Sequence, residues 1–199
     1  MAKKKIPSSQ KQQRLRKKRG IAGGAILTVI ITALLTVALG IYLLTKYGEK
    51  LPTFLILQRP EIKIINLYFS NDEGIALNAE KRKIVKGGLV KEIKQSLDAL
   101  INGPKGRLIS TIPNGTRLLD VEIKEEVAFL NFSKEISEKH PGGSYAEAQT
   151  VYSIVNTITL NFQEVKRVQL LIQGKKAKTL AGHIDISFPL GYNKDFIKG

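Results

Sequence analysis

Residues 117–132 carry the pattern that decides the fold, and they read RLLDVEIKEEVAFLNF. Within Arg117–Lys124, apolar residues alternate with polar or charged ones, which is typical of a strand with one buried face. Glu125 and Glu126 then interrupt the pattern, and Val127–Phe132 resumes it with more apolar residues. The segment therefore predicts an antiparallel β-hairpin.

Four further segments have the composition of strands. Ile62–Phe69 and Arg167–Ile172 are rich in Ile, Leu and Val, which predicts buried strands. Ala76–Ile84 contains polar residues at alternating positions and predicts a short second strand. Gly182–Phe188 predicts a short last strand.

Two segments show helical spacing. Leu89–Ile101 places its apolar residues on one face, and a Gly-Pro pair ends it. A second helix is expected from Ser144 to about Thr159, because Ser144 and Glu147 have the spacing of a capping box. The order strand, helix, hairpin, helix, strand predicts an α+β fold, in which two helices pack on one face of a small, mainly antiparallel sheet.

The N-terminal part has the pattern of a membrane anchor. Ile21–Thr45 is a run of 25 residues without a charge. As a helix it would be about 37 Å long, more than the roughly 30 Å of a hydrocarbon core. Met1–Arg19 contains nine Lys or Arg and no acidic residue, and such a flank stays on the cytoplasmic side. We therefore expect a single transmembrane helix with the N-terminus inside.

Two alternatives to an anchor remain at this stage, a cleaved signal peptide and a buried core helix. The run is longer than a usual signal core, and Ala38-Leu39-Gly40 is a poor cleavage site within it. The predicted organisation is a basic cytoplasmic tail (1–20), a transmembrane helix (21–45), a linker (46–60) and an extracytoplasmic domain (61–199). The linker contains the apolar cluster Phe54–Leu57, which lies at the bilayer interface or pairs with an edge of the domain.

Charge and composition exclude several classes of function. Of the net charge of +15, the first 19 residues supply +9, and the other 180 hold 23 basic and 17 acidic residues. The tail has no aromatic residue, which argues against nucleic-acid binding. It binds anionic lipid headgroups or only fixes the topology. The absence of cysteine excludes disulfides, thiol catalysis and a lipid-bearing cysteine anchor.

The sequence gives little indication of a catalytic site. His140 and His183 are the two histidines, and no Gly-x-Ser-x-Gly elbow accompanies either. His183 and Asp185 would share one face of a strand, where they form a hydrogen bond or contact a partner, but they are too few for a metal site. The carboxylates at the hairpin alternate with apolar residues, as on the solvated face of a sheet. We expect no catalytic residue, no cofactor and no metal.

Eight segments follow one another along the chain: Leu67–Ser70, Asn102–Pro104, Ser110–Thr116, Phe129–Ser133, Gly142–Ser144 with Glu147, Tyr152–Thr157, Val168–Ile172 and Thr179–Asp185. In this order they resemble the GerMN domain of sporulation and spore germination. The resemblance implies an extracytoplasmic module of the bacterial cell envelope, similar in fold to the ring-building motif, with no catalytic residues. It also implies roles in sporulation or germination, or in peptidoglycan functions beside an amidase. This chain has one copy of the domain, and a membrane helix takes the place of a lipoprotein anchor.

The expected function is that of a non-enzymatic interaction or assembly module. Its partner would be an envelope protein or a second copy of the chain; the alternative is a binding accessory of peptidoglycan or an amidase. A polar loop with Pro113 at the second position of a turn forms a contact surface or only shapes the chain before the hairpin. The candidate interaction or structural residues are Ser110, Thr111, Pro113, Asn114, Gly115, Thr116, Gly182, His183 and Asp185.

Overall fold

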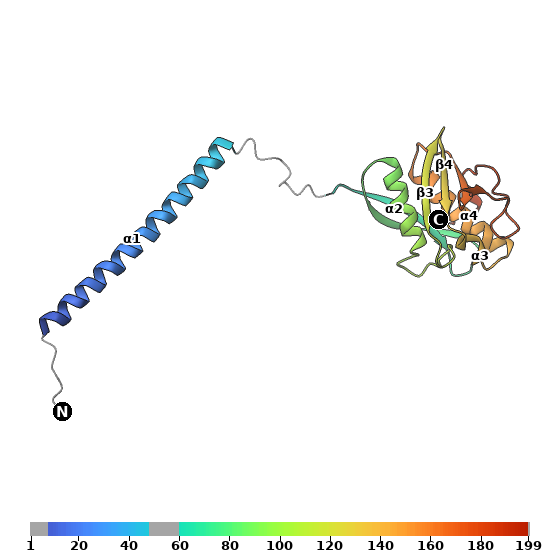
Figure 1. Ribbon diagram of the computed structural model, residues 1–199. Helices are drawn as coiled ribbons and strands as arrows, with labels where there is room; N and C mark the ends of the chain where they lie inside the picture. Colours follow the sequence, from blue (N-terminus) through green and yellow to red (C-terminus); the bar gives the residue numbers. More distant parts are fainter. Residues whose placement is uncertain (1–7, 48–59, 199) are drawn as a thin grey trace, which may run out of the picture. The chain divides into compact units, whose positions relative to one another are not determined.

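The computed structural model describes residues 8–47 and 60–198, with side chains in 26–47 and 60–198. The chain divides into two units, Met1–Gln58 and Arg59–Gly199, which are described separately (Figure 1). The predicted basic tail and the Phe54–Leu57 cluster both lie wholly outside the residues whose side chains are described.

The first unit is built on one long helix, α1 (Ser8–Tyr47). Its stretch Ile26–Tyr47 is long and apolar enough to cross a membrane, and none of it is buried by the rest of the chain. Twenty-two residues of helix measure about 33 Å, which matches a hydrocarbon core. The hydroxyl groups of Thr32 and Thr36 donate to the carbonyls of Val29 and Ala33 at 2.9 and 2.8 Å, so these polar groups are satisfied without water.

The second unit contains two sheets. The first is the antiparallel hairpin of β1 (Ile62–Ser70) and β2 (Leu77–Val85). The second has the strand order β3-β4-β5-β6, in which β4 and β5 run parallel and the other pairs antiparallel. Its strands are β3 (Leu118–Lys124), β4 (Val127–Phe132), β5 (Arg167–Ile172) and β6 (Lys175–Lys176).

Two main helices pack against these sheets. α2 (Leu89–Ile101) contacts β1, β2 and β3, and α4 (Ser144–Asn161) contacts β1 and β5, so α4 joins the two sheets (Figure 1). Shorter helical turns are α3 (Glu135–Glu138) and η3 (Lys194–Phe196). One core cluster includes residues of both sheets and both main helices. The predicted α+β class is confirmed.

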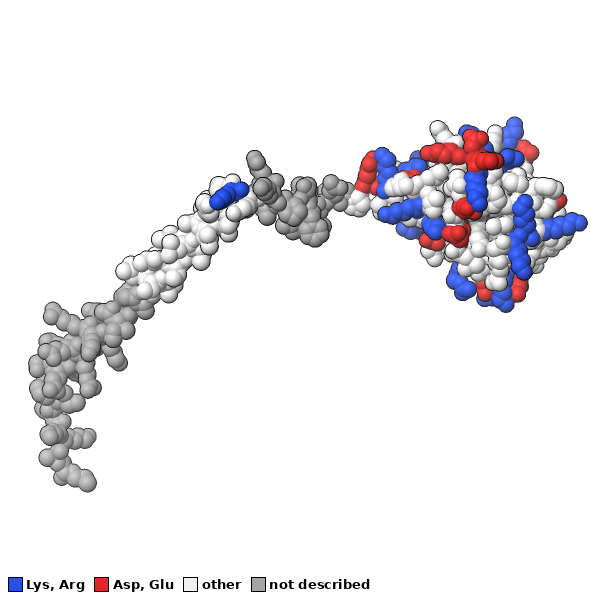
Figure 2. Space-filling model, turned by 45° about the horizontal axis from the view of Figure 1, so that its top comes forward, with Lys and Arg blue, Asp and Glu red and all other residues white. Residues whose placement is uncertain are grey.

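The surface of this unit is mixed in charge. Residues 61–199 contain 20 basic and 16 acidic side chains. Figure 2 shows both signs interspersed over the face that it views, without a continuous field of one sign. On this face, the distribution gives no electrostatic funnel toward one site.

Most predicted elements occur at their expected positions, but two details differ. A bulge between Leu118 and Asp120 breaks the alternation in β3, so Leu119, expected on the buried face, is 46% exposed. The expected strand Gly182–Phe188 does not form, and only Leu190 makes an isolated bridge, to Val168. Side-chain contacts described below hold that segment instead.

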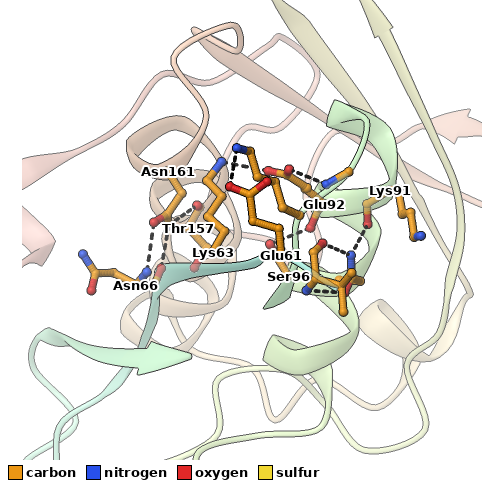
Figure 3. Close-up of polar contacts among 12 residues, drawn as sticks. Glu61, Lys63, Asn66, Lys91, Glu92, Ser96, Thr157 and Asn161 are labelled. Carbon is orange, nitrogen blue, oxygen red and sulfur yellow. Dashed lines mark hydrogen bonds and ion pairs between the residues drawn. The ribbon is translucent and has the colours of Figure 1, made fainter. Parts of the chain in front are cut away.

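Side chains of α4 cover the outer edge of β1. Asn161 Oδ1 accepts the backbone N–H of Asn66 at 2.9 Å, and its Nδ2 donates to the carbonyl of Asn66 at 2.6 Å (Figure 3). Thr157 Oγ1 accepts the N–H of Tyr68 at 3.2 Å. These side chains therefore take the place of a neighbouring strand for backbone groups that face away from β2.

A partly buried ion pair ties β1 to α2. Lys63 Nζ lies 2.8 Å from Glu92 Oε2, and it also lies over the ring of Phe162, 4.5 Å from the centroid (Figure 3). The N–H of Gly87 donates to Glu92 Oε1 at 2.8 Å and, together with Lys63, lowers the pKa of Glu92. The buried carboxylate at the start of α2 is thus paired and hydrogen-bonded.

The β3–β4 turn carries backbone strain that a substitution should relieve. Glu125 and Glu126 both have positive φ, 46° and 62°, as in the type I′ turns that favour Asn-Gly. We expect Glu125→Asn with Glu126→Gly to raise the free energy of unfolding by about 1–2 kcal/mol, measured by urea denaturation. A Gln-Gln control removes the charges but keeps the strain, so an equal gain in that variant would contradict this explanation.

Candidate functional site

The first turns of α4 hold two loops that the sequence analysis singled out. One is the Ser110–Thr116 loop, and the other is residues 179–185, here called the 179–185 loop. Contacts from Glu147, Thr150 and Ser153 of α4 reach these loops. The site is therefore organised by a helix face, with the two loops attached to it.

The Ser110–Thr116 loop contains the expected turn, displaced by one residue. The N–H of Thr116 donates to the carbonyl of Pro113 at 3.2 Å, and the Thr116 hydroxyl donates to the same oxygen at 2.7 Å. Pro113 is therefore the first residue of the turn and not the second. Gly115, at the third position, has a φ of 84°, which a type II turn requires.

A chain of hydrogen bonds fixes this loop to α4. Thr111 Oγ1 donates to Ser153 Oγ at 2.7 Å, and Thr150 Oγ1 donates to the carbonyl of Thr111 at 2.6 Å. The N–H of Gly142 donates to His140 Nδ1 at 3.0 Å, so Nε2 carries the proton that faces Thr150 Oγ1, also at 3.0 Å. Burial lowers the pKa of His140. A neutral imidazole is thus a structural link in the chain.

A shallow groove lies beside the same loop. It has a volume of about 500 Å³. Ile109 and Tyr145 are its exposed apolar residues, and the loop contributes one wall. Its lining residues include Ser110, Pro113, Asn114, Pro141, Tyr145 and Gln149. An exposed aromatic ring beside a rigidly held polar loop is suited to contact with a partner.

The 179–185 loop is organised by a fully buried carboxylate. Glu147 is 0% exposed, and its Oε1 accepts the N–H groups of Leu180 and Ala181 at 2.8 and 2.9 Å. Its Oε2 accepts the N–H of His183 at 2.8 Å and lies 3.2 Å from His183 Nδ1. Burial raises the pKa of Glu147, but these N–H donors, with that of Ile184, outweigh it, so the pKa lies below its usual value.

The predicted capping box is wrong because Glu147 is used elsewhere. Gly143 is the N-cap residue of α4, and no side chain caps this end. Glu147 turns into the protein interior and binds the 179–185 loop. Because the N–H groups of Leu180, Ala181 and His183 donate to that carboxylate, they are not available to pair with a neighbouring strand.

His183 and Asp185 have separate partners. His183 faces Glu147, whereas Asp185 Oδ1 accepts the N–H and the hydroxyl of Ser187 at 2.9 and 2.5 Å. The Ser187 hydroxyl lowers the pKa of Asp185. Gly182 has a φ of 104°, and its N–H donates to Thr179 Oγ1 at 3.0 Å. His183 therefore ties the loop to α4, whereas Asp185 makes only a local contact, and the two do not interact as a pair.

The hairpin carboxylates lie on the surface. Asp120 faces Lys94 at 3.4 Å, and Glu122 pairs with Lys124 at 2.7 Å. All four of these side chains are 44% exposed or more. Within residues 26–47 and 60–198, no group of three or more His, Asp or Glu is placed to hold a metal ion.

Comparison with known proteins identifies the class. A family model described as "Germane: Sporulation and spore germination" matches residues 66–178, more than half of the chain. The chain belongs to this family, and the predicted GerMN resemblance is confirmed. No curated protein matches the chain.

Two solved structures show the same fold. The tandem GerMN domains of the sporulation protein GerM from Bacillus subtilis are 24% identical, with a TM-score of 0.55. The match covers 66% of this chain and 46% of that one, about half of the tandem. The first GerMN domain of the same protein is 22% identical, with a TM-score of 0.51 and coverage of 65% and 97%. A candidate lipoprotein from Clostridium perfringens is 28% identical, with a TM-score of 0.48 and coverage of 68% and 89%.

Proposed function

We propose that this protein is a membrane-anchored, non-enzymatic interaction module of the bacterial cell envelope, active in sporulation or germination or in other envelope assembly. The membership of residues 66–178 in the sporulation and germination family carries the proposal. The helix Ile26–Tyr47 supports the anchor, and the basic flank Met1–Arg19 supports an N-terminus inside the cell. Residues 61–199 would then lie outside the cytoplasm.

The hydrogen bonds of His140 and Glu147 are structural, which supports a binding role over catalysis. His140 donates to Thr150, and Glu147 is bound by N–H groups of the 179–185 loop. The hydroxyl that His140 contacts, that of Thr150, is buried, receives the proton of His140 Nε2 and donates its own to the carbonyl of Thr111, so His140 is not placed as its general base. The groove with Tyr145 and the Ser110–Thr116 loop is the proposed contact surface, and its partner is an envelope protein or a second copy.

A single cysteine experiment tests both the topology and the contact surface. The chain has no cysteine, so Tyr145→Cys gives a unique thiol at the groove. Phe188→Cys is the matched control, because Phe188 is also an exposed aromatic residue but does not line the groove. In intact cells, a membrane-impermeant maleimide that carries a photo-crosslinker should label both variants, and Ser8→Cys should stay unlabelled until the cells are permeabilised.

After irradiation, Tyr145→Cys should capture one protein at least fivefold more than Phe188→Cys, with mass spectrometry as the readout. Labelling of Ser8→Cys in intact cells would contradict the topology. Equal capture by both variants would contradict the groove. Capture of lysozyme-sensitive glycan in place of protein would favour the binding accessory of peptidoglycan.

A further inference from the structure

The β1–β2 hairpin has two faces with different surroundings. Residues directly opposite each other in an antiparallel pair share a face, and here Ile64 is opposite Lys83 and Ile62 is opposite Val85. The other face carries Ile65, Leu67 and Ile84, which are buried in the core. The face of Ile64 is thus left outside the core over the first half of β1.

We name this outer surface the Ile64 patch, and it combines apolar and basic side chains. Ile64 is 62% exposed and Ile62 is 49% exposed, which is unusual for isoleucine. Lys81 and Lys83 are exposed on the same face, and among the described residues neither forms an ion pair. The patch consists of Ile62, Ile64, Lys81, Lys83 and Val85.

The edge of β2 disfavours an additional protein strand at this patch. Gln95 covers the end of β2 by exchanging two hydrogen bonds with the backbone of Val85, at 2.9 and 2.8 Å. Lys198 covers the beginning, because its N–H donates to the carbonyl of Leu77 at 3.1 Å. The interval between them carries Lys81 and Lys83, and exposed lysines on an edge strand oppose pairing with another chain.

The place of the patch in the chain favours a lipid surface. The apolar helix ends at Tyr47, and Ile62 begins β1 only 15 residues later. Even a fully extended chain of that length spans at most about 50 Å. The patch therefore stays within about 50 Å of any bilayer that holds the helix, at a high effective concentration.

We propose that the Ile64 patch binds the surface of the bilayer in which the chain is anchored, with anionic phosphate headgroups as the ligand. Ile62 and Ile64 enter the interface, while Lys81 and Lys83 reach the phosphates with their long side chains. This inference rests on the proposed anchoring by Ile26–Tyr47. Its consequence is a fixed orientation of the domain, which presents one set of surfaces to partners.

Tryptophan fluorescence of the full-length chain tests the proposal. The chain has no tryptophan, so Ile64→Trp is a single probe within the patch, and Phe188→Trp is a matched exposed control. Each variant is reconstituted in vesicles of phosphatidylcholine with or without phosphatidylglycerol, and brominated lipids serve as the quencher. We expect a blue shift and quenching for Ile64→Trp only, and only with phosphatidylglycerol.

Substitution of the two lysines tests how much the charges contribute to lipid binding. Each lysine should contribute a factor of about five, so Lys81→Gln with Lys83→Gln should lower the ratio of docked to free domain about 25-fold, and high salt should act in the same direction. Flotation with the vesicles measures anchoring separately and should not change. If the protein floats with the vesicles but Ile64→Trp is not quenched, the proposed lipid contact of the Ile64 patch is wrong while the anchoring stands. The same holds if an unquenched blue shift depends on protein density, because that result indicates contact with a second copy. A chain that does not float would overturn the anchoring and this inference with it.

Discussion

Replacing Glu147 with alanine is expected to lower the free energy of unfolding of the Arg59–Gly199 unit by about 3–5 kcal/mol. The carboxylate is fully buried and accepts the N–H groups of Leu180, Ala181 and His183. Alanine would leave these donors without an acceptor and would open a cavity beside α4. Urea denaturation followed by circular dichroism measures the change.

Two further variants separate the causes. Glu147→Gln keeps the shape but directs an amide toward N–H donors, so we expect a loss of about 2–3 kcal/mol. Glu138→Ala is the matched control, because Glu138 is an exposed glutamate that pairs with Lys134 at 2.9 Å. Glu138→Ala should lower the free energy of unfolding by less than about 0.5 kcal/mol. A loss for Glu147→Ala as small as that of Glu138→Ala would contradict the anchoring role of Glu147.

The same carboxylate predicts a dependence on pH. Its pKa in the folded protein lies below the ordinary value of 4.5, so the ionised form is the one that folding favours. The stabilisation is therefore fully present above pH 4.5 and is lost as the pH falls through the folded-state pKa. Between pH 5 and 3, wild type should lose more stability than Glu147→Gln.

Local patterns predicted the elements well, because their signals lie within a few residues. The apolar spacing of Leu89–Ile101 predicted the bounds of α2, and the alternation around Glu125 and Glu126 predicted the hairpin. The expected strand at Gly182–Phe188 failed for a non-local reason. Glu147, some 35 positions earlier, binds the N–H of His183 in that segment and that of Leu180 just before it. Nothing in the local sequence of the segment signals this competition.

The candidate site was predicted only in part. The Ser110–Thr116 loop does line a groove, but the residues that hold it, His140 and Thr150, gave no signal in the sequence. The spacing of Ser144 and Glu147 indicated a capping box, although a glutamate near the start of a helix can equally turn inward. A carboxylate within an otherwise apolar helix face was the signal that could have identified Glu147.

Asn161→Ala is the second substitution with a large expected effect. The side-chain amide of Asn161 pairs with both backbone groups of Asn66, as a neighbouring strand would. Alanine would leave one donor and one acceptor of β1 unpaired at a partly buried position, and within residues 60–198 no strand lies beside this edge to pair with them. We expect the free energy of unfolding to fall by about 2–4 kcal/mol, measured by urea denaturation.

Amide hydrogen exchange distinguishes this explanation from a general loss of helix stability. The N–H of Asn66 should exchange faster in Asn161→Ala by a larger factor than the core amides of β4 do. Thr159→Ala is the matched control on the same helix, because the Thr159 hydroxyl donates only to the carbonyl of Val155, at 2.7 Å. Thr159→Ala should lower the free energy of unfolding by less than about 0.5 kcal/mol and leave the exchange of the Asn66 N–H unchanged. Uniform acceleration across both sheets in Asn161→Ala would show that α4, and not the edge of β1, had been weakened.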